Sequence, residues 1–117
     1  MVFLIVDDSP RMRESFKRTI SQSVPNNHKV YEAADGNEAI RMYDEVRPDW
    51  VLMDIKMEPM DGLEASRIIL ASHPEARIII LTNYDDVGYR KAAREAGVRK
   101  YILKERFNEV PAILLGQ

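Results

Sequence analysis

Asp49-Trp50-Val51-Leu52-Met53-Asp54 has the composition of a buried strand. The apolar run has no helical period, ends on a carboxylate, and is followed by Pro59 and Gly62, which stop the strand and turn the chain. A strand that is apolar on both faces is typical of a parallel sheet covered by helices on both sides. We therefore expect a central strand with Asp54 at its tip, at the edge where the carboxyl ends of such strands form the site.

A second strand has the same design. Residues 1–6 are apolar and β-branched, end on Asp7-Asp8, and lead through Ser9-Pro10 into a helical pattern. If this strand lies parallel to the strand that carries Asp54, three carboxylates converge at one edge of the sheet. Like charges at such distances repel unless a cation lies among them. The sequence therefore predicts a site for Mg²⁺, a cation that prefers oxygen ligands.

Strands and helices alternate along the whole chain. The expected strands are residues 1–6, 28–33, 49–54, 76–81 and 100–103, and the expected helices run from about 10 to 22, 37 to 46, 60 to 72, 84 to 96 and 107 to 115. Crossovers of this length favour parallel strands with right-handed connections. The expected fold class is α/β, a doubly wound five-stranded parallel sheet with helices on both faces.

Length and composition exclude several kinds of protein. The 117 residues are enough for one domain, 1–117, that buries its own core. No cysteine is present, which excludes disulfides and Cys-ligated zinc. A net charge of −2 offers no basic field for nucleic-acid binding by this domain itself, and no apolar run suits a membrane span or a signal peptide. We expect a cytoplasmic protein.

The other strand tips carry a hydroxyl and an ammonium group. Thr82 follows the fourth expected strand and Lys104 follows the fifth. Beside three acids these groups suit a phosphoryl group on Asp54, because the hydroxyl can donate to one phosphoryl oxygen and the ammonium can neutralise another. Each residue alone is commonplace, since an Asp-Asp pair, a threonine or a lysine more often caps a helix or lies in solvent.

Taken together, these motifs resemble the receiver domain of two-component response regulators over essentially the whole chain. The residues that carry the resemblance are Asp7-Asp8, Asp54 with Met57, Met60-Asp61-Gly62, Thr82, Ala96-Gly97-Val98, Tyr101 and Lys104. The resemblance implies a flavodoxin-like fold with strand order 2-1-3-4-5.

The resemblance also implies roles for single residues. Asp54 would be the phosphoacceptor, and Mg²⁺ would be held by Asp7, Asp8, Asp54 and the backbone carbonyl of Lys56. Thr82 and Tyr101 would couple phosphorylation to an output face from about residue 84 to 115. The implied partners are a histidine kinase or phosphotransfer protein and a downstream effector. Sequence leaves open a homodimer and a DNA-binding domain belonging to a longer regulator.

Two positions depart from the family pattern. Glu58 stands where proline is usual, with Pro59 after it, so the loop can sit differently. Glu105 replaces a proline that usually follows the lysine through a cis bond. Lys-Glu at this point resembles the receivers of LuxR-type transcription factors. We expect a cis Lys104–Glu105 bond, so that Lys104 still reaches the acids, although a non-proline cis bond costs about 3–4 kcal/mol.

Three functions can be compared. The first is a phosphorylation switch that is not an enzyme beyond its own phosphorylation and dephosphorylation. The second is a pseudo-receiver that acts as a binding module without phosphorylation, which would be expected if the acids were missing. The third is a phosphatase of the haloacid-dehalogenase kind, which requires Asp-x-Asp after the first strand, whereas Asp7 and Asp8 are adjacent here. The intact acids favour the switch.

Overall fold

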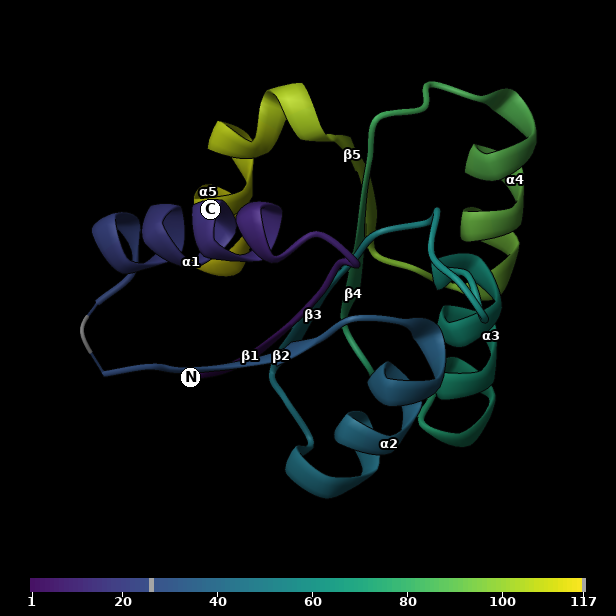
Figure 1. The fold of residues 1–117 in the computed structure, drawn as a ribbon, viewed down its shortest axis with the longest axis horizontal. Helices are drawn as coiled ribbons and strands as arrows, with labels where there is room; N and C mark the ends of the chain where they lie inside the picture. The colour runs from purple at the N-terminus through teal and green to yellow at the C-terminus, as the bar shows by residue number, and fades with distance from the viewer. Residues whose placement is uncertain (26, 117) are drawn as a thin grey trace.

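The computed structural model describes residues 1–25 and 27–116 and contains a five-stranded sheet (Figure 1). Its strands pair in parallel in the order β2-β1-β3-β4-β5, which confirms the doubly wound fold and the order expected from the sequence. The bounds are β1 Val2–Val6, β2 Lys29–Ala33, β3 Trp50–Met53, β4 Ile78–Thr82 and β5 Lys100–Leu103.

Four of the helices follow a residue whose side chain caps a free backbone N–H group of the first turn. The helices are α1 Pro10–Ser23, α2 Gly36–Val46, α3 Gly62–Ser72 and α4 Val87–Ala96. Ser9, Asp35, Asp61 and Asp86 precede them and accept from the N–H three residues later. The caps explain why α3 and α4 begin two or three residues later than the sequence pattern suggested.

Helices cover both faces of the sheet and divide the core into two layers (Figure 1). On one face α1 and the C-terminal helix pack through Phe16, Ile20 and Val110 against side chains such as Ile5. On the other face α2, α3 and α4 pack against the opposite side of the same strands. Consecutive residues of β1, β3 and β4 enter the two layers alternately, so these strands are apolar on both faces up to Thr82 at the end of β4.

The chain after β5 differs from the single helix expected over 107–115. A 3₁₀ helix, η1, spans Lys104–Glu109, and a short helix, α5, spans Val110–Leu114. The expectation of a cis Lys104–Glu105 bond is wrong, because the cis bond in the described part of the chain is Glu58–Pro59. η1 begins directly at Lys104, and with a trans Lys104–Glu105 bond the Lys104 side chain still reaches Asp7 and Asp54.

One finding concerns membranes. Within residues 1–25 and 27–116, no helix is both long enough and apolar enough to span a bilayer.

Candidate functional site

The register of the sheet brings two buried acids together. Val6 of β1 is aligned with Met53 of β3, so the residues that follow them, Asp7 and Asp54, leave neighbouring strands at the same level. Backbone hydrogen bonds extend this alignment, since the N–H of Asp54 donates to the Val6 carbonyl oxygen at 2.9 Å. A parallel pair of strands therefore places the two carboxylates at one edge of the sheet, as the sequence predicted.

Three carboxylates meet at this edge. One oxygen from each of Asp7, Asp8 and Asp54 can be chosen so that all three lie within 4.8 Å of one another. Asp7 is 1% exposed and Asp54 is 7% exposed, whereas Asp8 faces solvent. We refer to these three residues as the acid cluster. It is therefore open to solvent on the side of Asp8 and closed on the side of Asp7.

Lys104 supplies a cation to the acid cluster. Its Nζ donates to Oδ2 of Asp7 at 2.9 Å and lies 3.4 Å from Oδ1 of Asp54. Burial alone would lower the pKa of Lys104, but the Asp7 hydrogen bond and the charge of Asp54 outweigh it and raise that pKa. The lysine is therefore charged at neutral pH and offsets part of the negative charge.

The environment of Asp54 opposes its ionisation. Burial, followed by the negative charge of Asp7, raises the pKa of Asp54 from 3.8 to about 6, although Lys104 acts in the opposite direction. The Oδ1 atom of Asp54 also accepts from the N–H of Ile55 at 2.9 Å. The charge of Lys104 thus does not fully offset the burial of Asp54 and its repulsion by Asp7. A further cation would lower the free energy of the ionised cluster.

The donor set of the acid cluster suits Mg²⁺. All its side-chain ligands are carboxylate oxygens. Two of them belong to the buried residues Asp7 and Asp54, and the third belongs to the exposed Asp8. The described residues of the cluster include no sulfur or imidazole group that would select a softer metal. Because Asp8 is exposed, a cation could retain water molecules on that side, which is usual for Mg²⁺.

Thr82 is the last residue of β4, and Tyr101 is the second residue of the neighbouring strand β5. Thr82 is fully buried, and its Oγ1 accepts from the N–H of Tyr84 at 3.2 Å. The Tyr101 hydroxyl donates to the carbonyl oxygen of the same Tyr84 at 2.6 Å, so both residues hold the loop between β4 and α4. The guanidinium of Arg90 lies over the Tyr101 ring, 4.5 Å from its centroid. In this arrangement Tyr101 is half-buried and bonded to the loop.

Lys56 links the loop after β3 to the loop after β4. Its Nζ lies 5.4 Å from the ring centroid of Tyr84 and 5.2 Å from that of Tyr89. Beside it a cavity of about 480 Å³ opens next to Asp8. The cavity is lined by Asp8, Lys56, Met57, Glu58 and Asp61. The acid cluster therefore meets this cavity through Asp8.

Sequence reasoning missed Arg13 and did not foresee the close packing of Gly62, although both residues position the acids. Nη1 of Arg13 donates to the carbonyl oxygen of Asp7 at 2.6 Å, and its Nε bonds Glu32 at 2.9 Å. Gly62 was expected only to turn the chain, yet a Cβ atom at this position would lie 1.7 Å from the carbonyl oxygen of Asp54. The turn signal of Gly62 was visible in the sequence, whereas no local pattern distinguishes Arg13 from other helix arginines.

The sequence and the fold are similar to those of known proteins. Residues 3–114 match the family model of the response regulator receiver domain. The chain is 41% identical over 101 residues to the chemotaxis protein CheY of Listeria monocytogenes, covering 86% of this chain and 83% of that protein. A solved two-component response regulator of the LuxR family from Aurantimonas sp. SI85-9A1 has a TM-score of 0.86 at 37% identity, covering 99% of this chain and 86% of that one.

Other relatives are longer than this chain. The transcriptional regulatory protein DegU of Brevibacillus brevis is 32% identical over 102 residues. The match covers 87% of this chain but 43% of DegU, so the chain spans less than half the length of that relative.

Proposed function

Because the chain belongs to the response regulator receiver domain family, we propose that it is a switch that is phosphorylated on Asp54. The proposed donor is the phosphohistidine of a histidine kinase or phosphotransfer protein. The observation that carries the proposal is the meeting of Asp7, Asp8, Asp54 and Lys104 at one edge of the sheet. A pseudo-receiver is not favoured, since none of these groups has been lost.

In the proposed reaction a carboxylate oxygen of Asp54 attacks the phosphorus atom. A new O–P bond forms, the P–N bond of the phosphohistidine breaks, and the released imidazole takes a proton from water. Asp54 must be ionised to attack, so the Lys104 ammonium helps by favouring the carboxylate over the acid. The same ammonium can then pair with a phosphoryl oxygen.

The remaining side chains would position the reactants. Asp7, Asp8 and Asp54, with the Lys56 carbonyl as the family implies, would hold Mg²⁺, which when bound neutralises charge on the phosphoryl oxygens. Thr82 could donate its hydroxyl proton to the phosphoryl group, and a movement of the side chain toward that group would stretch the bond that its Oγ1 accepts from the Tyr84 N–H. Hydrolysis of the acyl phosphate by water would return Asp54 to its carboxylate, and we propose no reaction beyond this self-modification.

The output would pass through the loop between β4 and α4. Thr82 and Tyr101 both bond Tyr84, so movement of Thr82 toward a phosphoryl group would change the surroundings of Tyr101. The output face proposed here consists of α4, β5, η1 and α5. A relative named as a transcriptional regulator and one named as a chemotaxis protein suggest that this face can act on different effectors.

Acetyl phosphate and Mg²⁺, followed by intact mass measurement, test the proposal. The wild type should gain one phosphoryl group, and Asp54→Asn should gain none. Asp61→Asn is the matched control, because Asp61 is an exposed carboxylate at the mouth of the site whose capping role asparagine can keep. Labelling of Asp54→Asn to the extent of the wild type would overturn the assignment.

A further inference from the structure

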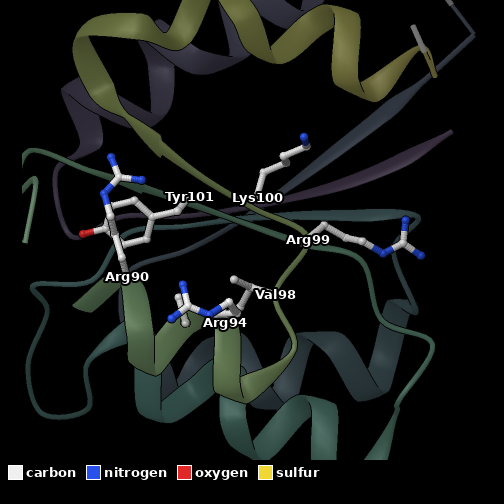
Figure 2. A pocket seen from close by; sticks show the side chains of 7 residues that line it. Arg90, Arg94, Val98, Arg99, Lys100 and Tyr101 are labelled. Carbon is white, nitrogen blue, oxygen red and sulfur yellow. The ribbon is translucent and has the colours of Figure 1, made fainter. Parts of the chain in front are cut away.

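A groove between α4 and the edge strand β5 carries a concentration of positive charge (Figure 2). Its volume is about 270 Å³. The groove is lined by Arg90, Ala93, Arg94, Val98, Arg99, Lys100 and Tyr101. Four cationic side chains and no acid thus line one groove of a chain whose net charge is −2. We call it the basic groove.

Three of these cations differ from the fourth in their ion pairs with the described residues. No carboxylate of the described residues forms an ion pair with Arg94, Arg99 or Lys100, although the neighbouring Lys91 is within 3.9 Å of Glu95. The fourth cation is different, because Arg90 bonds Asp85 at 2.8 Å and lies over the Tyr101 ring. Arg90 therefore forms a fixed wall of the groove, while the other three are free to receive an anionic ligand.

The free cations lie on both sides of the edge strand. Figure 2 shows Arg94 on the side of α4, whereas Lys100 extends toward the C-terminal helices. β5 pairs with β4 alone, so its other edge has no strand beside it. An extended chain along this edge would point successive side chains alternately to the two sides.

We propose that the basic groove binds an extended acidic segment of a partner protein, laid along β5. Adjacent acidic residues of that segment would face Arg94 and Arg99 on one side and Lys100 on the other. A long nucleic acid fits less well, because the groove offers four cations on a chain of net charge −2, whereas a continuous phosphate backbone needs a more extended basic surface. The inference deepens the proposed function by giving its output partner a chemical class.

The test uses the full chain and a synthetic probe. The probe is a peptide of Asp-Glu-Thr repeats about eight residues long, and the same peptide with Asn and Gln in place of the acids is its neutral control. Titration into ¹⁵N-labelled protein should shift amides of α4 and β5 in a saturable way that weakens with added salt. The neutral peptide should produce no saturable shift.

Variants locate the binding. Arg94→Gln/Arg99→Gln should weaken binding of the acidic peptide about tenfold. Replacing Lys100 together with either arginine should have the same effect. Arg11→Gln/Arg18→Gln removes two exposed cations of α1 and is the matched control, expected to bind as the wild type does. Shifts centred on α1, equal loss in both double variants, or tighter binding of an oligothymidylate of the same charge would overturn the inference.

Phosphorylation on the same samples separates the two proposals. Arg94→Gln/Arg99→Gln should still accept a phosphoryl group from acetyl phosphate, because neither arginine contacts the acid cluster. A wild type that is labelled but binds no acidic peptide would overturn the inference about the basic groove alone. Peptide binding by a wild type that accepts no phosphoryl group would overturn the proposed function alone. An edge strand whose cations serve only to prevent association of sheet edges would bind no peptide.

Discussion

The ammonium of Lys104 lies 2.9 Å from a carboxylate oxygen of Asp7, although 97 positions separate the two residues in the chain. Asp7 is almost fully buried, so its charge has little access to water. A buried charge that loses its partner costs several kcal/mol, which is more than the intact pair contributes to folding. The pair therefore makes stability depend on the same residues that we propose for the chemistry.

Replacing the lysine should expose this dependence. In the absence of metal, Lys104→Met should lower the free energy of unfolding by about 2–4 kcal/mol, because Asp7 and Asp54 would remain buried without a cation. Mg²⁺ should restore part of the loss. Urea unfolding with EDTA and with Mg²⁺ measures both effects, and Lys91→Met, on the exposed face of α4, is the control. Equal stability of the two variants would contradict the argument.

The raised pKa of Asp54 predicts a pH dependence. A carboxyl group with a pKa of about 6 in the folded state and 3.8 when unfolded binds more protons in the folded state between those values. Stability should therefore fall as pH rises from about 4 to 6, by at most about 3 kcal/mol. In EDTA, Asp54→Asn should remove this fall and be more stable than the wild type at pH 7.5.

Urea unfolding from below about pH 4 to above about pH 6, which brackets the predicted fall, tests the Asp54 prediction. Asp61→Asn, which removes an exposed carboxylate of the neighbouring loop, should keep the fall seen in the wild type. A fall of the same size in Asp54→Asn would place its origin elsewhere.

Metal binding should stabilise the folded protein by linkage. A ligand that binds only the folded state adds about 2.7 kcal/mol at a concentration one hundred times its dissociation constant. Mg²⁺ should therefore raise the melting temperature of the wild type, and Asp8→Asn should reduce that rise by removing one carboxylate. Asp86→Asn, an exposed cap of α4, should respond as the wild type does. An undiminished response of Asp8→Asn would exclude Asp8 as a ligand.

The sheet and the acid cluster could be predicted because their signals are local and repeated. Val51-Leu52-Met53 is apolar without a helical period, and register then fixes where the following Asp54 lies relative to Asp7. The order of the strands needed more than periodicity, and it came from the resemblance to a family. Helix starts were less certain, since Asp61 and Asp86 compete with neighbouring polar residues as caps.

The errors and omissions arose where contacts join distant segments. The trans Lys104–Glu105 bond depends on η1 starting at the end of β5, and a 3₁₀ turn has no clear sequence pattern. The link from Arg13 to the backbone of Asp7 depends on how α1 packs beside β2. The basic groove was only a set of scattered charges in the sequence, because α4 and β5 bring them together through the fold.

The Tyr101 hydroxyl should contribute modestly to stability. Tyr101→Phe removes the bond to the Tyr84 carbonyl oxygen and should cost about 0.5–1.5 kcal/mol, with phosphorylation of Asp54 retained. Amide shifts should centre on the loop between β4 and α4. Tyr84→Phe is the control, because Tyr84 takes part through its backbone and its side chain is 47% exposed. Unchanged stability of Tyr101→Phe would show that this bond does not hold the loop.

Gly62 should be indispensable to the geometry of the acid cluster. Its N–H donates to the carbonyl oxygen of Ile55 at 2.9 Å, and a Cβ atom at Gly62 would lie 1.7 Å from the carbonyl oxygen of Asp54. Backbone cannot yield as a flexible side chain can, so Gly62→Ala should destabilise the protein by about 3 kcal/mol or more and slow its labelling by acetyl phosphate.

Gly88→Ala is the matched control for Gly62→Ala. At Gly88 the nearest atom to an added Cβ is an oxygen of the Asp86 side chain, at 3.1 Å, so this side chain needs to shift only slightly and can keep its capping bond. Alanine also favours the helical conformation over glycine by up to about 1 kcal/mol. Gly88→Ala should therefore match or exceed the wild type in melting temperature and label normally. If Gly62→Ala also kept the melting temperature and labelling rate of the wild type, the loop after Asp54 would have to be free to move away, and the close approach of Gly62 could not be what positions Asp54.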